Sequence, residues 1–126
     1  MPADSAGAVS PPPRRGRLSR AAEFEAVVQL GRSVGGRYLT LRFRRRERAG
    51  VARVGFAVPR KVGGAVDRNK VKRRLREAVD SHPELLAEST DYVVIARPGI
   101  AAAADARGFE WLSEQVAGLL RQAVPE

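Results

Sequence analysis

Cysteine is absent from the 126 residues, and histidine occurs once, as His82. Disulfide scaffolds and thiolate metal sites are therefore excluded, and a single imidazole cannot build a histidine-rich metal site. Apolar runs are also short, and none approaches the roughly 20 consecutive apolar residues that a membrane-spanning helix requires. We therefore expect no membrane partner and no zinc. A chain of this length encloses one modest core.

The first 13 residues contain little that could build a core. They are rich in Pro, Ser, Gly and Ala and lack the apolar central run of a secretory signal. We predict a disordered tail over residues 1–13 and a single domain over residues 14–126. The default expectation for location is the cytoplasm.

Acidic residues are scarce where basic residues are dense. Residues 1–80 hold 20 of the 23 Lys and Arg but 7 of the 14 Asp and Glu, a net charge of +13, while residues 81–126 carry −4, which gives the total of +9. A charge of this sign and size favours a polyanionic partner. Most of the cations are Arg, whose planar fork suits phosphate, although an Arg-rich and Ala-rich chain can also reflect a GC-rich genome.

The apolar spacing predicts a helix and then a strand in the first part of the chain. Ser19 is a candidate N-cap for a helix that runs to Leu30 and stops at Gly31. From residue 38 the period becomes two, which predicts a half-buried strand with a basic face. The residues predicted to face inward are Leu39, Leu41 and Phe43, and those predicted to face the other way are Tyr38, Thr40, Arg42 and Arg44.

Three further elements follow from the same criteria. Residues 51–58 alternate again after a polar turn at 45–50, which predicts a hairpin with the preceding strand. After Pro59 and a Gly pair, a helix is predicted that begins between Ala65 and Arg68 and ends at about Asp80. Residues 91–97 are apolar on both faces, which is typical of a strand inside a sheet with parallel pairing. A last amphipathic helix is predicted over residues 105–122, with Trp111 as a packing or rim residue.

The predicted helix that ends at about Asp80 contains the densest charge in the chain. Residues 68–76 include six cations and no acid before Glu77. At 100° per residue, an apolar stripe formed by Val71, Leu75, Ala78 and Val79 would dock the helix on the core. Most of the polar side chains fall on a neighbouring arc of roughly 140°, with Lys70 and Arg74 on the far flank. The members of this arc are Arg68, Asn69, Lys72, Arg73 and Arg76.

Four interpretations of this basic helix compete. A solvated helix face normally mixes both signs of charge, and this one does not. Calmodulin-target and membrane-surface helices need a larger apolar face than this short stripe. A leucine zipper is excluded because Pro83 ends the helix soon after the basic run, and helix-turn-helix DNA binding needs an adjacent helix where strands are predicted. RNA is therefore the favoured ligand, and DNA is not.

Catalysis by the chain itself has little support. There is no Gly-rich phosphate loop, the one histidine, His82, stands next to Pro83, and no acidic pair lies within the basic region. Glu23 and Glu25 are predicted to be surface residues, and Asp67 is predicted to cap a helix. Two alternatives stay open: a stand-alone nuclease with unrecognised carboxylates, and a general RNA-binding or ribosome-associated protein.

The motif Arg68-Asn69-Lys70-x-Lys72-Arg73-x-x-Arg76-Glu77 closely resembles the signature helix of the bacterial ribonuclease P protein family. Further blocks occur in the family's order and spacing between about Arg17 and Arg121. These blocks are Arg17-Leu18, Glu23-Phe24, Gly31-x-Ser33, Arg53 to Val58, Arg60 to Gly63 with Ala65-Val66, and Asp91 to Arg97.

The resemblance implies both a fold and a function. The implied fold is α/β (α+β): a small single domain with a mostly antiparallel sheet, one parallel pair and a left-handed βαβ crossover, and helices packed on the sheet. The sequence rules alone would favour the opposite hand. The implied role is accessory subunit of an endoribonuclease, in which a catalytic RNA subunit uses Mg²⁺ to remove the 5′ leader of precursor tRNA. The protein itself would then need no cofactor and no catalytic residue.

The resemblance also assigns two binding sites. The residues expected to contact the RNA subunit are Arg68, Asn69, Lys70, Lys72, Arg73 and Arg76. Those expected to line a cleft for the leader, between the first helix and the sheet, are Phe24, Tyr38, Arg42, Arg60, Lys61 and Arg97. Rings and alternating cations can hold single-stranded RNA with little sequence choice, although Phe24 and Tyr38 could equally be core residues.

Three positions depart from the family's pattern. Lys70 stands where an arginine is frequent and loses the bidentate fork. Val28 stands where a second aromatic residue is frequent, which would weaken stacking on the leader. Pro59 replaces a residue that is usually polar and could change the direction of Arg60 and Lys61.

Overall fold

The computed structural model describes residues 15–125, so the tail predicted over residues 1–13 lies outside the described residues. Five strands, three α-helices and two short 3₁₀ helices make up this part of the chain. In chain order they are β1 (Gly16–Arg17), α1 (Ala21–Leu30), β2 (Arg32–Gly35), β3 (Leu39–Arg45), β4 (Arg53–Ala57), η1 (Arg60–Val62), α2 (Ala65–Asp80), η2 (Pro83–Leu85), β5 (Thr90–Ala96) and α3 (Ile100–Gln122).

The strands form one mixed sheet in the order β1-β4-β5-β3-β2. β5 lies at its centre, antiparallel to β3 and parallel to β4, as its two apolar faces predicted. β2 pairs with β3 in antiparallel fashion, and the two residues of β1 add a short second parallel pair at the edge of β4. The α+β class with a parallel pair is therefore confirmed.

The predicted hairpin of β3 with β4 is wrong, because β5 lies between these two strands. Residues 46–52 instead cross the end of β5, where Arg46 N donates to Ser89 O at 2.8 Å and Ser89 N donates to Gly50 O at 2.8 Å. Alternation specifies that a segment is half-buried, but it does not specify which strand lies beside it. The doubly apolar β5 takes the central place because both of its faces must be covered.

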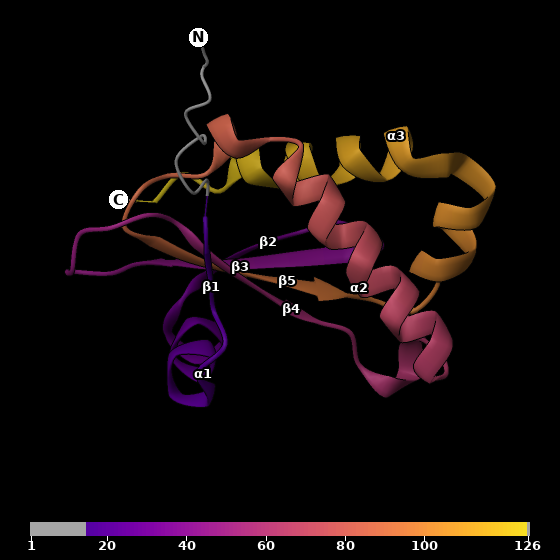
Figure 1. Cartoon of the computed structure of the whole chain (residues 1–126), viewed down its shortest axis with the longest axis horizontal. Coiled ribbons are helices and arrows are strands. Elements are labelled where there is room, and N and C mark those ends of the chain that lie inside the picture. The colour runs from indigo at the N-terminus through magenta and orange to yellow at the C-terminus, as the bar shows by residue number, and fades with distance from the viewer. Residues whose placement is uncertain (1–14, 126) are drawn as a thin grey trace, which may run out of the picture.

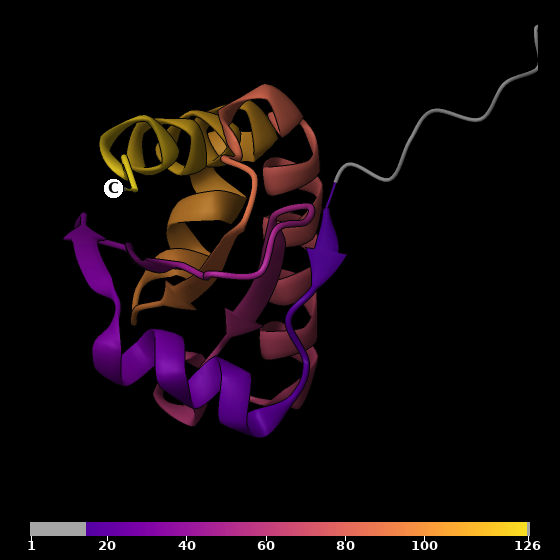
Figure 2. The same ribbon diagram turned by 90° about the vertical axis from the view of Figure 1, so that its left-hand side faces the viewer.

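Helices cover the two faces of the sheet unequally. Figures 1 and 2 show α2 and α3 together on one face and α1 alone on the other, with α1 crossing the strands. The main core lies under α2 and α3, while a small cluster of Leu18, Val27 and Val93 lies under α1. Viewed along the strands in Figure 2, the chain passes from β4 through α2 to β5 in the left-handed sense.

Some helix ends differ from the prediction. α1 begins at Ala21 after Arg20 and has no side-chain cap, so Ser19 is not its N-cap. Gly31 does end α1, as predicted. Its φ of −77° is accessible to any residue, so lack of space explains the glycine: a Cβ there would lie 2.8 Å from the Phe43 carbonyl oxygen. α3 begins at Ile100, earlier than predicted, and changes direction at Gly108, where φ is 87°.

Two polar predictions also need correction. Asp67 lies in the first turn of α2 and makes no capping bond; Gly64 is the N-cap. Glu23 is not merely a surface residue, because its Oε2 accepts a hydrogen bond from Arg53 Nη1 at 2.8 Å. Glu25 is exposed and accepts a hydrogen bond from Gln29, as expected of a surface residue.

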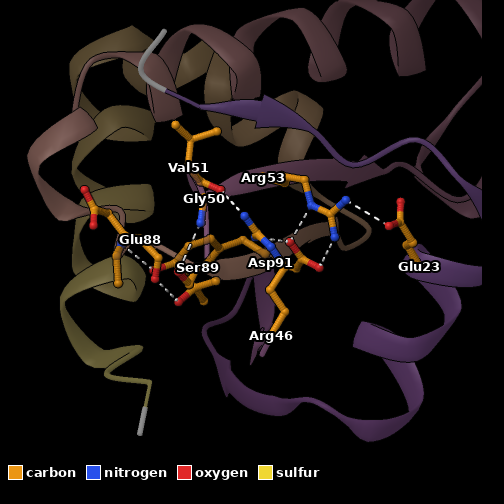
Figure 3. Close-up of polar contacts among 11 residues, drawn as sticks. Glu23, Arg46, Gly50, Val51, Arg53, Glu88, Ser89 and Asp91 are labelled. Atoms are coloured by element: carbon orange, nitrogen blue, oxygen red, sulfur yellow. Dashed lines mark hydrogen bonds and ion pairs between the residues drawn. The ribbon is translucent and has the colours of Figure 1, made fainter. Parts of the chain in front are cut away.

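The Glu23 contact belongs to a network around the buried carboxylate of Asp91, which is 6% exposed (Figure 3). Arg53 binds both carboxylate oxygens, with Nε to Oδ1 at 2.8 Å and Nη2 to Oδ2 at 2.7 Å. Arg46 donates from Nη1 to Oδ1 at 2.8 Å and from Nη2 to the Val51 carbonyl. The Asp91 hydrogen bond raises the pKa of Arg53, so the cation persists at all ordinary pH values. The network fixes the 46–52 loop against β4 and β5.

Candidate RNA interface

Helix α2 docks on the sheet by the stripe that the sequence predicted. Val71 is 2% exposed, and Leu75, Ala78 and Val79 are 0% exposed, within the main core. Burial of one stripe fixes the rotation of the helix, so the neighbouring arc must face away from the core. Within that arc Asn69, Arg73 and Arg76 are exposed while Arg68 and Lys72 are half-buried, and Lys70 on the far flank is exposed.

Of the six cations in residues 68–76, one is paired with an acid among the described residues and five are not. Arg74, on the far flank, donates from Nη1 to Asp105 Oδ1 of α3 at 2.8 Å. This hydrogen bond lowers the pKa of Asp105; desolvation opposes the shift, and the charges of Arg74 and Lys70 reinforce it. The other five cations of residues 68–76 form no ion pair within the described residues 15–125. Their repulsion is left for an external anion to compensate.

The sheet face beside α1 presents an apolar strip. Phe24 and Val28 of α1, Ala57 of β4 and Ile95 of β5 are partly buried around the small cluster under α1. Phe24 packs on the backbone of β4, where a Cβ on Gly55 would lie 3.0 Å from its ring. The ring therefore has both a packing role and a half-exposed surface.

Arg42 lies at the end of α1 on this same face. Its Nη2 donates to the Gly31 carbonyl oxygen at 2.9 Å, while its buried Nε has no hydrogen-bond partner among the described residues. A cation at a helix C-terminus is electrostatically favourable, so this contact fixes the guanidinium in place.

The remaining basic residues of the predicted leader cleft lie beyond the ends of the parallel strands. Arg60 and Lys61 follow β4 in η1, and Arg97 follows β5 directly; all three are exposed. Since β4 and β5 are parallel with Ala57 opposite Ile95, these cations share one end of the sheet. Arg97 is anchored by a bond from Nη1 to the Gly36 carbonyl oxygen at 3.0 Å.

Tyr38 is separated from the rest of the predicted cleft. It precedes β3, and its ring packs on the α3 side of the sheet in an edge contact with Trp111, with centroids 5.5 Å apart. Arg37 and Arg107 cover the two rings from outside at 5.3 Å and 5.2 Å. The expectation that Tyr38 faces the same way as Arg42 is wrong, because the alternation of β3 begins only at Leu39.

The sequence missed a cluster at the free edge of β4. Arg15, before β1, pairs with Asp80 at the end of α2 through Nε and Oδ1 at 2.6 Å. Arg15 and Arg76 both lie over the ring of Phe56, at 5.5 Å and 6.0 Å from its centroid. Phe56 lies on β4, far from Arg15 along the chain, and nothing local to the sequence connects the two. No group of three or more His, Cys, Asp or Glu is placed to hold a metal within residues 15–125. No helix there is long and apolar enough to cross a membrane.

Comparison with known proteins assigns the family. The model of the family described as Ribonuclease P matches residues 13–124. The chain belongs to the ribonuclease P protein family. The match spans both parts of the interface, the helix α2 and the sheet face beside α1, and so confirms the resemblance found in the sequence.

Individual members of the ribonuclease P protein family are similar to this chain in sequence and in structure. The ribonuclease P protein component of Acidothermus cellulolyticus is 43% identical over 93 residues, 72% of this chain and 77% of that protein. The component of Brevibacillus brevis is 39% identical over 89 residues, 71% of each. The RNase P protein from Thermotoga maritima superposes with a TM-score of 0.77 at 29% identity, covering 87% of this chain and 99% of that one.

Proposed function

We propose that this chain binds the catalytic RNA subunit of ribonuclease P through the exposed arc of α2. Membership in the family supports its role as a subunit of this endoribonuclease in tRNA 5′ processing. The observation that carries the proposed contact is a docked helix with five cations free of acidic partners within residues 15–125. Such a face binds phosphates, and Asn69 adds an amide for a base or ribose. The proposed contacts are Arg68, Asn69, Lys70, Lys72, Arg73 and Arg76.

A second surface serves the precursor tRNA 5′ leader in this proposal. It consists of the strip beside α1 with Phe24 and Arg42, continued by Arg60, Lys61 and Arg97 at the end of the sheet. Half-exposed apolar side chains accept unstacked bases, and the cations accept the phosphates between them. Tyr38 is left out of this surface because it packs on α3. Val28 supplies an aliphatic contact, so stacking depends on Phe24 alone.

Cleavage is assigned to the RNA subunit together with Mg²⁺, and the protein contributes binding and orientation. We also propose that the chain holds no cofactor of its own and works in the cytoplasm, where tRNA precursors are processed. This division of labour fits the composition of the interface, which is basic and aromatic without a paired acid and base.

Reconstitution tests the proposal directly. The protein is added to a ribonuclease P RNA subunit and precursor tRNA at a low Mg²⁺ concentration that does not support cleavage by the RNA alone. We expect cleavage to be restored, and the gain to grow with leader length over the first few nucleotides. Unchanged cleavage would favour a general RNA-binding role, and cleavage by nuclease-treated protein without the RNA subunit would reveal a stand-alone enzyme.

The α2 face can be tested with two neighbouring arginines. Arg73→Gln is expected to weaken binding to the RNA subunit and to reduce the slope of log K against log salt by about 0.7 to 0.9, one phosphate's share of released counterions. Arg74→Gln is the matched control, because Arg74 is already paired with Asp105. Equal slopes for the two variants would remove Arg73 from the interface.

A further inference from the structure

A second basic feature lies at the free edge of β4. β1 pairs with β4 for two residues, Gly16 opposite Arg53 and Arg17 opposite Val54, after which the chain turns away toward α1. Leu18 N still donates to the Val54 carbonyl oxygen at 3.1 Å, but β1 does not extend alongside Phe56. A cavity of about 420 Å³ forms here, bounded by the β1 segment, α1, β4 and α2.

The walls of this cavity are cationic and aromatic. Arg15, Arg17, Lys72 and Arg76 line it together with the rings of Phe24 and Phe56, and none of its described lining residues is acidic. Arg15 is already bound to Asp80 outside the cavity. Arg17, Lys72 and Arg76 form no ion pair within residues 15–125, so three positive charges converge without an anion. A convergent set of cations of this kind matches a phosphate.

The wall of the cavity also contains an aromatic ring on which two arginine side chains pack. The guanidinium groups of Arg15 and Arg76 rest on the ring of Phe56, at 5.5 Å and 6.0 Å from its centroid. Contact with a ring orients a guanidinium plane, and RNA bases splayed out of a helix stack on such planes and on aromatic rings. The volume of the cavity is in the range of small-ligand sites, so the cavity can hold one nucleotide but not a duplex.

We propose that this cavity binds one unpaired nucleotide of the ribonuclease P RNA subunit, with its phosphate between Arg17, Lys72 and Arg76 and its base against the Arg76 and Phe56 stack. The inference rests on the proposed docking of that RNA on α2. The RNA subunit is favoured over the leader because two of the three cations, Lys72 and Arg76, belong to the α2 arc, whereas only Phe24 is shared with the proposed leader surface. Arg17 and Phe56 thereby become RNA-binding residues, Arg17 for the phosphate and Phe56 for the base.

Three substitutions test the cavity by affinity for the isolated RNA subunit. Arg17→Gln is expected to weaken binding about tenfold and to lower the salt slope by about 0.7 to 0.9. Phe56→Leu is expected to weaken binding about tenfold with the slope unchanged, since a stacking surface is lost and no charge. Arg20→Gln, an exposed arginine outside the cavity, is the control and should bind as the wild type.

The absence of cysteine allows a second measurement that a loss of folding cannot imitate. Ser19 lines the cavity, so Ser19→Cys carries a single thiol for a photoactivatable cross-linker, and Ala102→Cys on α3 is the control. We expect Ser19→Cys to cross-link to one or two adjacent nucleotides of the RNA subunit, and Arg17→Gln to abolish that product.

The outcomes separate this inference from the proposed function. Normal binding by Arg17→Gln and Phe56→Leu, with weakened binding by Arg73→Gln, overturns the cavity site and leaves the α2 interface standing. Cross-links to the leader, or scattered over the RNA subunit, overturn the assignment of the nucleotide. Failure of the wild-type protein to bind the RNA subunit overturns both.

Discussion

Asp91→Ala is expected to lower the free energy of unfolding by about 3 kcal/mol. Its carboxylate is 6% exposed and receives three charged hydrogen bonds, two from Arg53 and one from Arg46. Removing one partner of a buried ion pair strands the other charges in a site with little water, which is costly. Urea denaturation followed by circular dichroism at neutral pH measures the loss.

Asp105→Ala is the matched control, because Asp105 also pairs with an arginine at 2.8 Å but is exposed. Its unfolding free energy should stay close to that of the wild type, since exposed ion pairs contribute little. A loss for Asp91→Ala as small as that for Asp105→Ala would show that the network does not stabilise the fold. The double substitution Arg53→Met with Asp91→Leu should recover part of the stability, since it removes both members of the bidentate pair together. Arg46 then keeps its hydrogen bond to the Val51 carbonyl, and Glu23, which is partly exposed, loses only its contact with Arg53.

The features predicted correctly from the sequence depend on short-range spacing. The docking stripe of α2 and the central position of β5 follow from which residues are apolar, within segments of 16 and 7 residues. The family motif was found for the same reason, since its cations recur within one helix. A pattern of this kind can be recognised within one segment, whatever that segment packs against.

The features that could not be predicted depend on contacts between distant segments. β5 separates β3 from β4 because hydrophobic burial selects strand partners over the whole chain, and two half-buried strands have the same alternation in either arrangement. Tyr38 faces α3 because a ring of Trp111 lies there, 73 positions further along. The pairing of Arg15 with Asp80 spans 65 positions and has no local signal. These same contacts divide the predicted leader cleft and build the cavity at the edge of β4.

The packing of α2 on the core is expected to couple the stability of the folded protein to the proposed RNA binding. Six cations within nine residues destabilise an isolated helix through repulsion at i, i+4 spacing. Burial of the four apolar residues of the stripe opposes that repulsion in the free protein, and the Arg74–Asp105 pair neutralises one flank. In the proposed complex RNA supplies the remaining counter-charge, so the free protein is expected to be less stable than the complex.

Leu75→Ala isolates this coupling. Leu75 is 0% exposed at the centre of the stripe, and its truncation should cost about 3 kcal/mol through lost burial and the cavity left behind. Leu30→Ala is the control, because Leu30 is 68% exposed on α1 and its loss should cost little. The RNA subunit at about 100 times its Kd should restore about 2.7 kcal/mol to the Leu75 variant, as it binds the folded state alone. Thermal melts with and without RNA measure both values, and a Leu75 variant that RNA does not stabilise would separate the stripe from the RNA-binding face it is proposed to position.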